Sequence, residues 1–255
     1  MKPVCPTSRV LKPKNNDYDY ADLAFLIPHE PVRILTERTT RALAFYDPER
    51  QPWKIKRLQT WIEEVYIPII HEHHDFEEKI YFPFFRKLGA QGFDSQVDDH
   101  AQLMQKLEHV RKATASGSGD AARRAFADMA ELMLKHLDEE EEYWPTELRK
   151  HGAKKADEAE KLILAEGARH GGHAFQMILI LICEAMGCSM RGEHPAGGWG
   201  TRAVKDGFRG KLPWVVRRLL APAWENRWRW YYLMILLSIT EDHETPVGRL
   251  PGCCT

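Results

Sequence analysis

The spacing of hydrophobic and polar residues predicts a chain that is mainly helical. Apolar positions in the first 150 residues recur at intervals of three and four, as on a helix with one buried face. Breaks rich in glycine, proline or serine separate these stretches. A polar N-terminal arm is expected over residues 1–20. Four helices then follow: one that begins near Pro31 and ends at about Ala44, and three over residues 54–88, 95–115 and 121–150.

Local signals support these boundaries. Proline suits the first turn of a helix, so Pro31 places His29 at or just before a helix start. Pro68 predicts a kink in the second helix, and Ser95 with Asp98 resembles a capping box. Gly152 is a typical stop. Four amphipathic helices with short connections predict an all-α fold, an up-down-up-down four-helix bundle over residues 21–152.

The last third, residues 153–255, is expected to be a helical extension. It contains a polar helix over residues 152–170, an apolar stretch at 174–186 that is too short to span a membrane, and a glycine-rich loop over 187–212. The apolar stretch is expected to pack on the bundle or in a homodimer interface. A run of tryptophan, arginine and apolar residues follows over 212–239. Its favoured interpretation is a helix laid across the bundle, with arginine stems covering apolar surface. Peripheral membrane contact is the alternative.

Composition narrows the class of protein. The chain has 255 residues, of which 44% are hydrophobic and 29% charged, as in an ordinary globular protein. Its formal net charge of −1 gives no general attraction to nucleic acid or to a membrane. The five cysteines have no regular spacing, and the N-terminus lacks the apolar segment of a signal peptide. A reducing, cytoplasmic setting is therefore expected.

One short pattern occurs twice, as His74-x-x-x-Glu78 and as His136-x-x-x-Glu140. Each copy continues with an aromatic pair and has a proline five residues after the glutamate. Side chains four residues apart on a helix lie on one face, with Cβ atoms about 6 Å apart. Each copy therefore directs an imidazole and a carboxylate to the same place. Two such helices facing each other would form a nitrogen and oxygen site for one transition metal, or for two bridged by the carboxylates.

The bundle topology would bring two further histidines, His29 and His100, to the same level as this repeat. The full candidate set is His29, His74, Glu78, His100, His136 and Glu140. Apolar residues flank both copies at helical spacing, which argues against simple surface His–Glu pairs worth about 0.2–0.5 kcal/mol each. A buried acid on an apolar stripe is costly unless it is paired or bound to metal.

Other residues leave alternatives open. His73 and Glu77 form a rival pair one residue out of register, but only His74 and Glu78 reproduce the proline offset of the second copy. His71 lies on the same helix face as His74 and is a candidate to hold the ligand residues in place without binding the metal itself. Four acids of the last helix are expected on a solvated face, namely Asp138, Glu139, Glu141 and Glu142. His109, opposite His100, is expected to be exposed, and His170 and His173 to lie in a loop.

Taken in order, these ligand types resemble the hemerythrin-like (HHE cation-binding) family over roughly residues 20–150. The resemblance implies a non-haem di-iron centre, two Fe ions with carboxylate and oxo or hydroxo bridges, with zinc or manganese less favoured. Two features depart from the oxygen carriers of that family. Met104 stands where they have a fifth histidine, and the last helix has His136-x-x-x-Glu140 in place of His-x-x-x-x-Asp. Each iron would then have two imidazoles.

The four-His, two-Glu set resembles family members tied to iron or redox sensing and to nitrosative stress. The expected function is metal binding in iron, O₂ or NO sensing or handling, with a diatomic ligand as partner. A di-iron oxidoreductase acting on peroxide, NO or O₂ is the alternative, and a metal that only stabilises the bundle is a third. Ligand identity does not separate these functions, because catalysis depends on open coordination positions and access.

Overall fold

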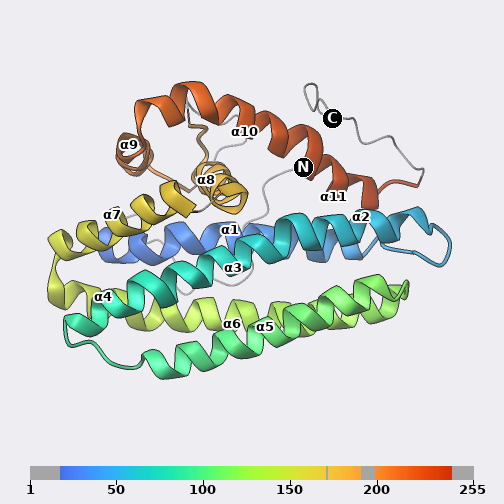
Figure 1. Ribbon diagram of the computed structural model, residues 1–255, viewed down its shortest axis with the longest axis horizontal. Helices are drawn as coiled ribbons and strands as arrows, with labels where there is room; N and C mark the ends of the chain where they lie inside the picture. Colours follow the sequence, from blue (N-terminus) through green and yellow to red (C-terminus); the bar gives the residue numbers. More distant parts are fainter. Residues whose placement is uncertain (1–17, 171, 191–198, 243–255) are drawn as a thin grey trace.

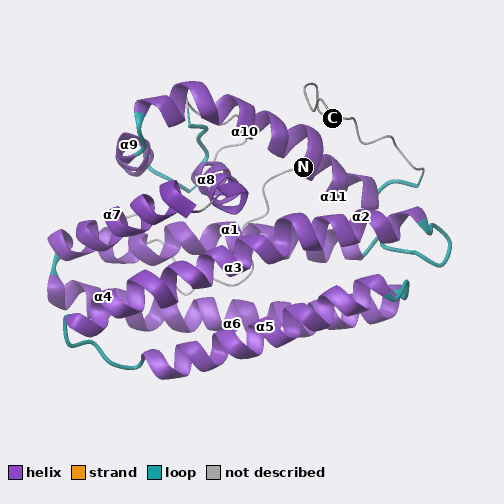
Figure 2. Ribbon diagram, in the orientation of Figure 1, coloured by secondary structure: helices purple, strands orange, loops and turns teal. Residues whose placement is uncertain are grey.

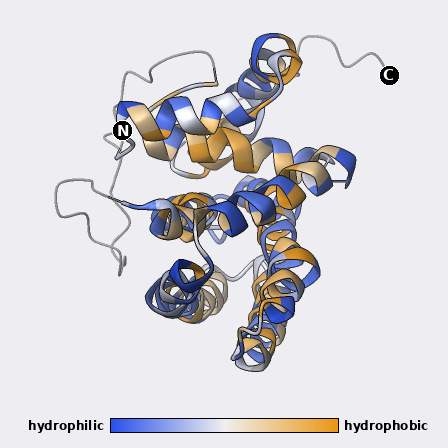
Figure 3. Ribbon diagram, turned by 90° about the vertical axis from the view of Figure 1, so that its left-hand side faces the viewer, coloured by the Kyte–Doolittle hydropathy of each residue, from blue (hydrophilic) through white to orange (hydrophobic). Residues whose placement is uncertain are grey.

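We describe a computed structural model that covers residues 18–170, 172–190 and 199–242. Every regular element within these ranges is a helix (Figure 2). Hydrophilic and hydrophobic stretches alternate along the helices, as the amphipathic pattern requires (Figure 3). The all-α class predicted from the sequence is confirmed. The N-terminal arm lies outside the described residues, apart from Tyr18 to Tyr20.

The first helix, α1 (Tyr20–Leu43), begins well before Pro31. The Asp19 carboxylate caps it by accepting hydrogen bonds from the backbone N–H groups of Ala21 and Asp22. The Asp22 carboxylate in turn accepts a hydrogen bond from the backbone N–H of Asp19. Pro31 therefore lies inside the helix. The expectation that His29 sits at a helix start is wrong: the histidine lies in the third turn, because the aspartate cap starts the helix earlier.

The second helical run is continuous but contains two π-turns. Its elements are α2 (Trp53–Trp61), η1 (Ile62–Tyr66), α3 (Ile67–Phe76), η2 (Glu77–Tyr81) and α4 (Phe82–Lys87). The hydrogen bonds that close the π-turns run from Ile67 N–H to the Ile62 carbonyl and from Phe82 N–H to the Glu77 carbonyl. A proline follows each, Pro68 and Pro83. Each π-turn inserts one extra residue into the helix.

Two further long helices follow, α5 (Phe93–Ala115) and α6 (Gly119–His151). Gly92, with φ of 91°, precedes α5, whereas the predicted cap Ser95 lies inside the helix and donates its hydroxyl to the Gly92 carbonyl. Ser118 caps α6 through the Ala121 N–H, and Gly152 with φ of 84° ends it as predicted.

Figure 1 shows α1, the α2–α4 run, α5 and α6 side by side. Helix α6 packs against both α1 and α5, while α5 also contacts α2. The remaining helices lie along the upper side in that view: α7 (Ala153–His170), α8 (Gly172–Met186), α9 (Arg202–Lys211), η3 (Val216–Leu220), α10 (Ala221–Arg227), η4 (Trp228–Tyr232) and α11 (Leu233–Ile239). Helix α9 replaces part of the predicted glycine-rich loop, because Thr201 caps it through the Val204 N–H.

The C-terminal helices share one apolar core with the first four runs. Leu35 and Leu107 belong to the same buried cluster as Leu181 of α8 and Trp228. Helix α8 contacts α1 and α3, and α11 contacts α2. The run over 212–239 therefore does lie across the other helices with one face buried. A second, mainly aromatic cluster packs Phe82, Phe93 and Trp144 together at the α4 end of the molecule.

We predict that the chain unfolds in one transition. Leu107→Ala in α5 and Leu181→Ala in α8 should each lower the free energy of unfolding by about 2–5 kcal/mol, because both remove a buried leucine from one shared core. Chemical denaturation followed by circular dichroism measures this. Two separate transitions, each moved by only one of the substitutions, would contradict it.

Candidate metal centre

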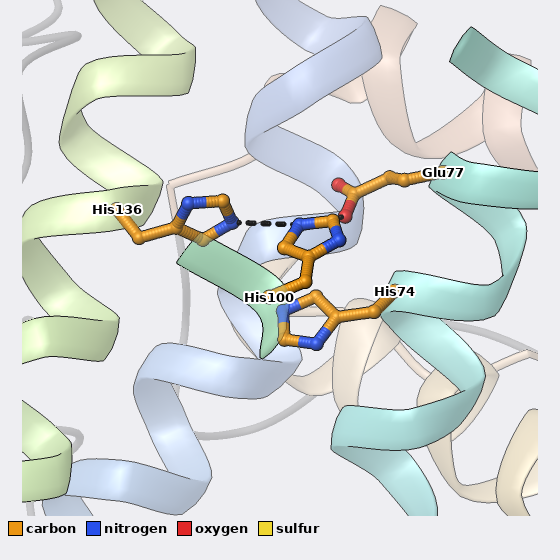
Figure 4. A group of neighbouring side chains, drawn as sticks. All are labelled: His74, Glu77, His100 and His136. Atoms are coloured by element: carbon orange, nitrogen blue, oxygen red, sulfur yellow. Dashed lines mark hydrogen bonds and ion pairs between the residues drawn. The ribbon is translucent and has the colours of Figure 1, made fainter. Parts of the chain in front are cut away.

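Seven buried side chains form two overlapping groups between the four long helical runs. One group is His74, Glu77, His100 and His136, and the other is His29, His73, Glu77 and Glu140. In each group the candidate ligand atoms all lie within 4.8 Å of one another. Figure 4 shows the first group, with His100 between His136 on one side and His74 and Glu77 on the other. Glu77 belongs to both groups.

Each long run contributes to the centre. Helix α1 supplies His29, α5 supplies His100, and α6 supplies His136 and Glu140 one turn apart. The second run supplies the adjacent His73 and His74, then Glu77 at the start of η2. Consecutive helical residues point about 100° apart, so His73 and His74 can serve different groups. This is how one helix contributes to both.

The structure brings Glu77, one residue before the predicted Glu78, into the centre. Glu77 is buried in the centre, whereas Glu78 has a side chain that is 41% exposed and takes part in neither group. The reason is the π-turn that begins at Glu77. Its extra residue puts Pro83 six positions after Glu77, while Pro145 follows Glu140 by five. The matching proline offset that favoured Glu78 was therefore misleading, and His73 joins the predicted histidines.

The two glutamates each direct one oxygen toward each group. Glu77 Oε1 lies 3.4 Å from His73 Nε2, while its Oε2 lies 3.4 Å from His100 Nε2. Glu140 Oε2 lies 3.2 Å from His29 Nε2, and its Oε1 lies 3.7 Å from His136 Nε2. This is the arrangement expected of carboxylates that bridge two neighbouring cations.

The donor atoms fit metal ions because many of them have no other partner. Among the described residues, eight buried atoms of the centre lack a hydrogen bond: Nε2 of His29 and of His73, both ring nitrogens of His74, Nδ1 of His136, Oε2 of Glu77 and both carboxylate oxygens of Glu140. Leaving buried polar groups unpaired is costly. Imidazole nitrogens with carboxylate oxygens suit iron, zinc or manganese, so coordination would remove this cost.

Protonation also favours metal binding. Burial lowers the pKa of His73, His74 and His136, and neighbouring histidines add to the effect on His73 and His74. Neutral imidazoles have a lone pair ready for a metal. Burial and the negative charge of Glu140 raise the pKa of Glu77. Burial opposes ionisation of Glu140 as well, but His136 and His29 outweigh it and lower the pKa of that carboxyl.

A second layer of charged groups supports the centre from the α1 side. Glu141 lies 3.0 Å from Nδ1 of His29 and forms a buried ion pair with Arg33, which also donates to Asp138 at 2.8 Å. Although burial opposes protonation of His29, its contacts with Glu140, Glu141 and Glu77 raise its pKa well above the usual value. The expectation that Glu141 lies on a solvated face is wrong: it is 1% exposed.

Glu78 has a related position on the other side, with Oε1 2.8 Å from His100 Nδ1. The outer nitrogens of His29 and His100 are thus both held by carboxylates, which orients the rings. From the sequence alone, Arg33 was missed and Glu141 was assigned to solvent, because acids in a charged run usually face solvent. The signal was Arg33 itself, one turn after His29 on the same face of α1.

Aromatic rings close the centre toward the α4 end of the molecule. Phe82 stacks on His100 with ring centroids 5.8 Å apart, and Phe25 meets His29 edge-on at 6.2 Å. Tyr81 packs on Phe25 at 5.4 Å. All three rings are buried, so they shield this side of the centre from water.

The remaining histidines lie outside the centre. His71 and His109 are exposed, which contradicts a supporting role for His71 and confirms the expectation for His109. His170 ends α7 and His173 lies near the start of α8, so neither lies in the expected loop. Met104 is half-buried and packs against the apolar core. The fifth imidazole of the centre comes instead from the His73–His74 pair, so one group contains three imidazoles and the other two, where two in each were expected.

Fold and site together define an all-helical protein with a buried histidine and glutamate centre suited to cations. Residues 29–146 match the family model of the hemerythrin HHE cation binding domain. No curated protein and no solved structure matched the chain. Within the described ranges, none of the helices is long and apolar enough to cross a membrane.

The register of the first motif can be tested with neighbouring glutamates. Glu77→Gln should strongly reduce the metal content of purified protein, because it removes the charge shared by both groups. Glu78→Gln should retain most of the metal, since an amide can still accept a hydrogen bond from His100. Plasma emission spectroscopy measures both. The opposite ranking would restore the register with Glu78.

Arg33→Met should lower the free energy of unfolding by about 3–5 kcal/mol, because it removes the guanidinium that pairs with the buried Glu141. The matched control is Arg38→Met. The Arg38–Glu184 pair is about a quarter exposed, so its loss should cost about 0–1 kcal/mol. If urea denaturation showed that the two variants lose equal free energy of unfolding, the buried Arg33–Glu141 pair would have no special role.

Proposed function

We propose that the protein binds two iron ions, one in each group, and uses the pair to sense or handle iron, O₂ or NO. The observation that carries this proposal is the placement of Glu77 and Glu140, each with one oxygen toward each group. Iron is favoured over zinc and manganese because the centre combines five imidazoles with bridging carboxylates. The fold part of the proposal is an up-down-up-down four-helix bundle over residues 21–152 in a cytoplasmic protein.

The two proposed metal positions have unequal donors. His74, His100 and His136 with Glu77 would hold one ion, and His29, His73 and Glu140 with Glu77 the other. When bound, the irons would supply one-electron redox chemistry and positions for a diatomic ligand. The protein's own part is to keep His73, His74 and His136 neutral, to orient His29 and His100 through Glu141 and Glu78, and to exclude water with the aromatic rings.

Metal stoichiometry tests the proposal. Wild-type protein loaded with ferrous iron without oxygen should hold two irons per chain, and Glu77→Gln should lose both. His74→Ala should keep about one, because His74 belongs to one group only. The control is His71→Ala, a neighbouring exposed histidine, which should keep two. One zinc, no metal, or two irons in His74→Ala would overturn the assignment.

A response to diatomic ligands tests the functional part. Adding NO or O₂ to the reduced, loaded protein should change its visible spectrum, and Glu77→Gln should show no such change. Multiple turnovers of NO, O₂ or peroxide by the wild type would favour the oxidoreductase instead. If none of these molecules changed the spectrum of the loaded protein, the bound metal would have a purely stabilising role.

A further inference from the structure

The exposed large hydrophobic side chains of the protein are concentrated in one place. Of the nine in the described part of the chain, five lie between residues 214 and 230: Trp214, Val215, Leu219, Leu220 and Trp230. Trp214 and Leu219 are each 60% exposed, and Trp230 is 65% exposed. Isolated exposed apolar residues are ordinary, but such a group commonly marks an interaction site. We call these five residues the outer stripe.

The outer stripe lies on a helical run that is anchored to the protein mainly by its second half. Trp228, Tyr232 and Ile235 are buried against the rest of the protein. The run from η3 to α11 curves along the outer edge of the molecule (Figure 1). From Trp214 to Trp230 the helical rise is about 24 Å. The stripe is thus a long, convex surface rather than a groove that would hold a peptide.

The charge around the stripe is positive. Residues 212–240 contain four arginines, Arg217, Arg218, Arg227 and Arg229, and a single acid, Glu225. Arg218 and Arg229 are exposed, and within the described ranges neither has an acidic partner. Elsewhere exposed basic side chains are commonly paired, as Lys79 is with Asp75 and Lys135 with Glu139. The surface therefore offers uncompensated positive charge beside exposed tryptophans.

A second copy of the chain fits this surface poorly. In a two-fold symmetric contact the stripe would face itself, which brings the arginines of both copies together. Like charges across an interface are repulsive. A partner with negative charge and a yielding apolar interior matches better. Tryptophan prefers the boundary between lipid headgroups and acyl chains, and arginine reaches the headgroups from an apolar base.

We propose that the outer stripe docks the protein on a membrane surface rich in anionic lipid. The tryptophans and leucines enter the boundary region while Arg218 and Arg229 pair with headgroup phosphates or carboxylates. The helix lies parallel to the surface and does not span it. The metal centre is buried among other helices and takes no part in the contact.

Cosedimentation of full-length, metal-loaded protein with phosphatidylcholine vesicles, with or without phosphatidylglycerol, tests this. The wild type should bind only the anionic vesicles, and high salt should release it. Arg218→Gln combined with Arg229→Gln should weaken binding about fivefold for each charge removed. Trp214→Ala combined with Leu219→Ser should abolish measurable binding, with metal content unchanged in both variants.

The controls are Phe45→Ala and Arg50→Gln, which are also exposed but lie outside the stripe and should bind as the wild type does. Three results would overturn the proposal. One is no binding to anionic vesicles, and another is equal binding by all variants. The third is a dimer in sedimentation velocity that Trp214→Ala with Leu219→Ser dissolves, which would make the stripe a contact between two copies.

Discussion

The burial of two carboxylates among five imidazoles is the constraint on which the structure depends. Glu77 and Glu140 both lie buried inside the protein. The desolvation cost of a buried carboxylate is several kcal/mol, and the neighbouring imidazoles repay it only in part. Metal cations placed between the groups would satisfy the unpaired oxygens and nitrogens together. Arg33, one turn after His29, already pairs with Glu141 and Asp138.

The fold serves this constraint through local irregularities as much as through regular helices. The π-turn over Glu77–Tyr81 directly follows the α-helical stretch that carries His73 and His74, and it shifts the positions after Glu77 by one residue. The early cap at Asp19 extends α1 so that His29 lies within a rigid helix rather than at a frayed end. The aromatic cluster around Phe82 and Trp144 closes the neighbouring end of the core. Together these features hold the candidate ligand residues in position.

Regular periodicity predicted the helical class, most helix boundaries and five of the six expected residues in the centre. Prediction failed where one residue of offset mattered. The repeat suggested Glu78 because its spacing to proline matched, and no pattern in the sequence announces a π-turn directly. Glu141 was assigned to a solvated face because its buried partner, Arg33, lies more than 100 residues away in the chain. Such long-range pairings depend on how helices meet, which periodicity does not specify.

Mössbauer spectroscopy of protein loaded with isotopically enriched iron tests the central claim most directly, because it reports both the ligand sets and the coupling of the two ions. Ferric ions that share Glu77 and Glu140 should give two distinct quadrupole doublets, since their donor sets differ, and a diamagnetic ground state from coupling through the bridge. Magnetically split spectra of isolated high-spin ferric ions at low temperature would contradict a shared centre. They would reduce the two groups to independent or single-metal sites.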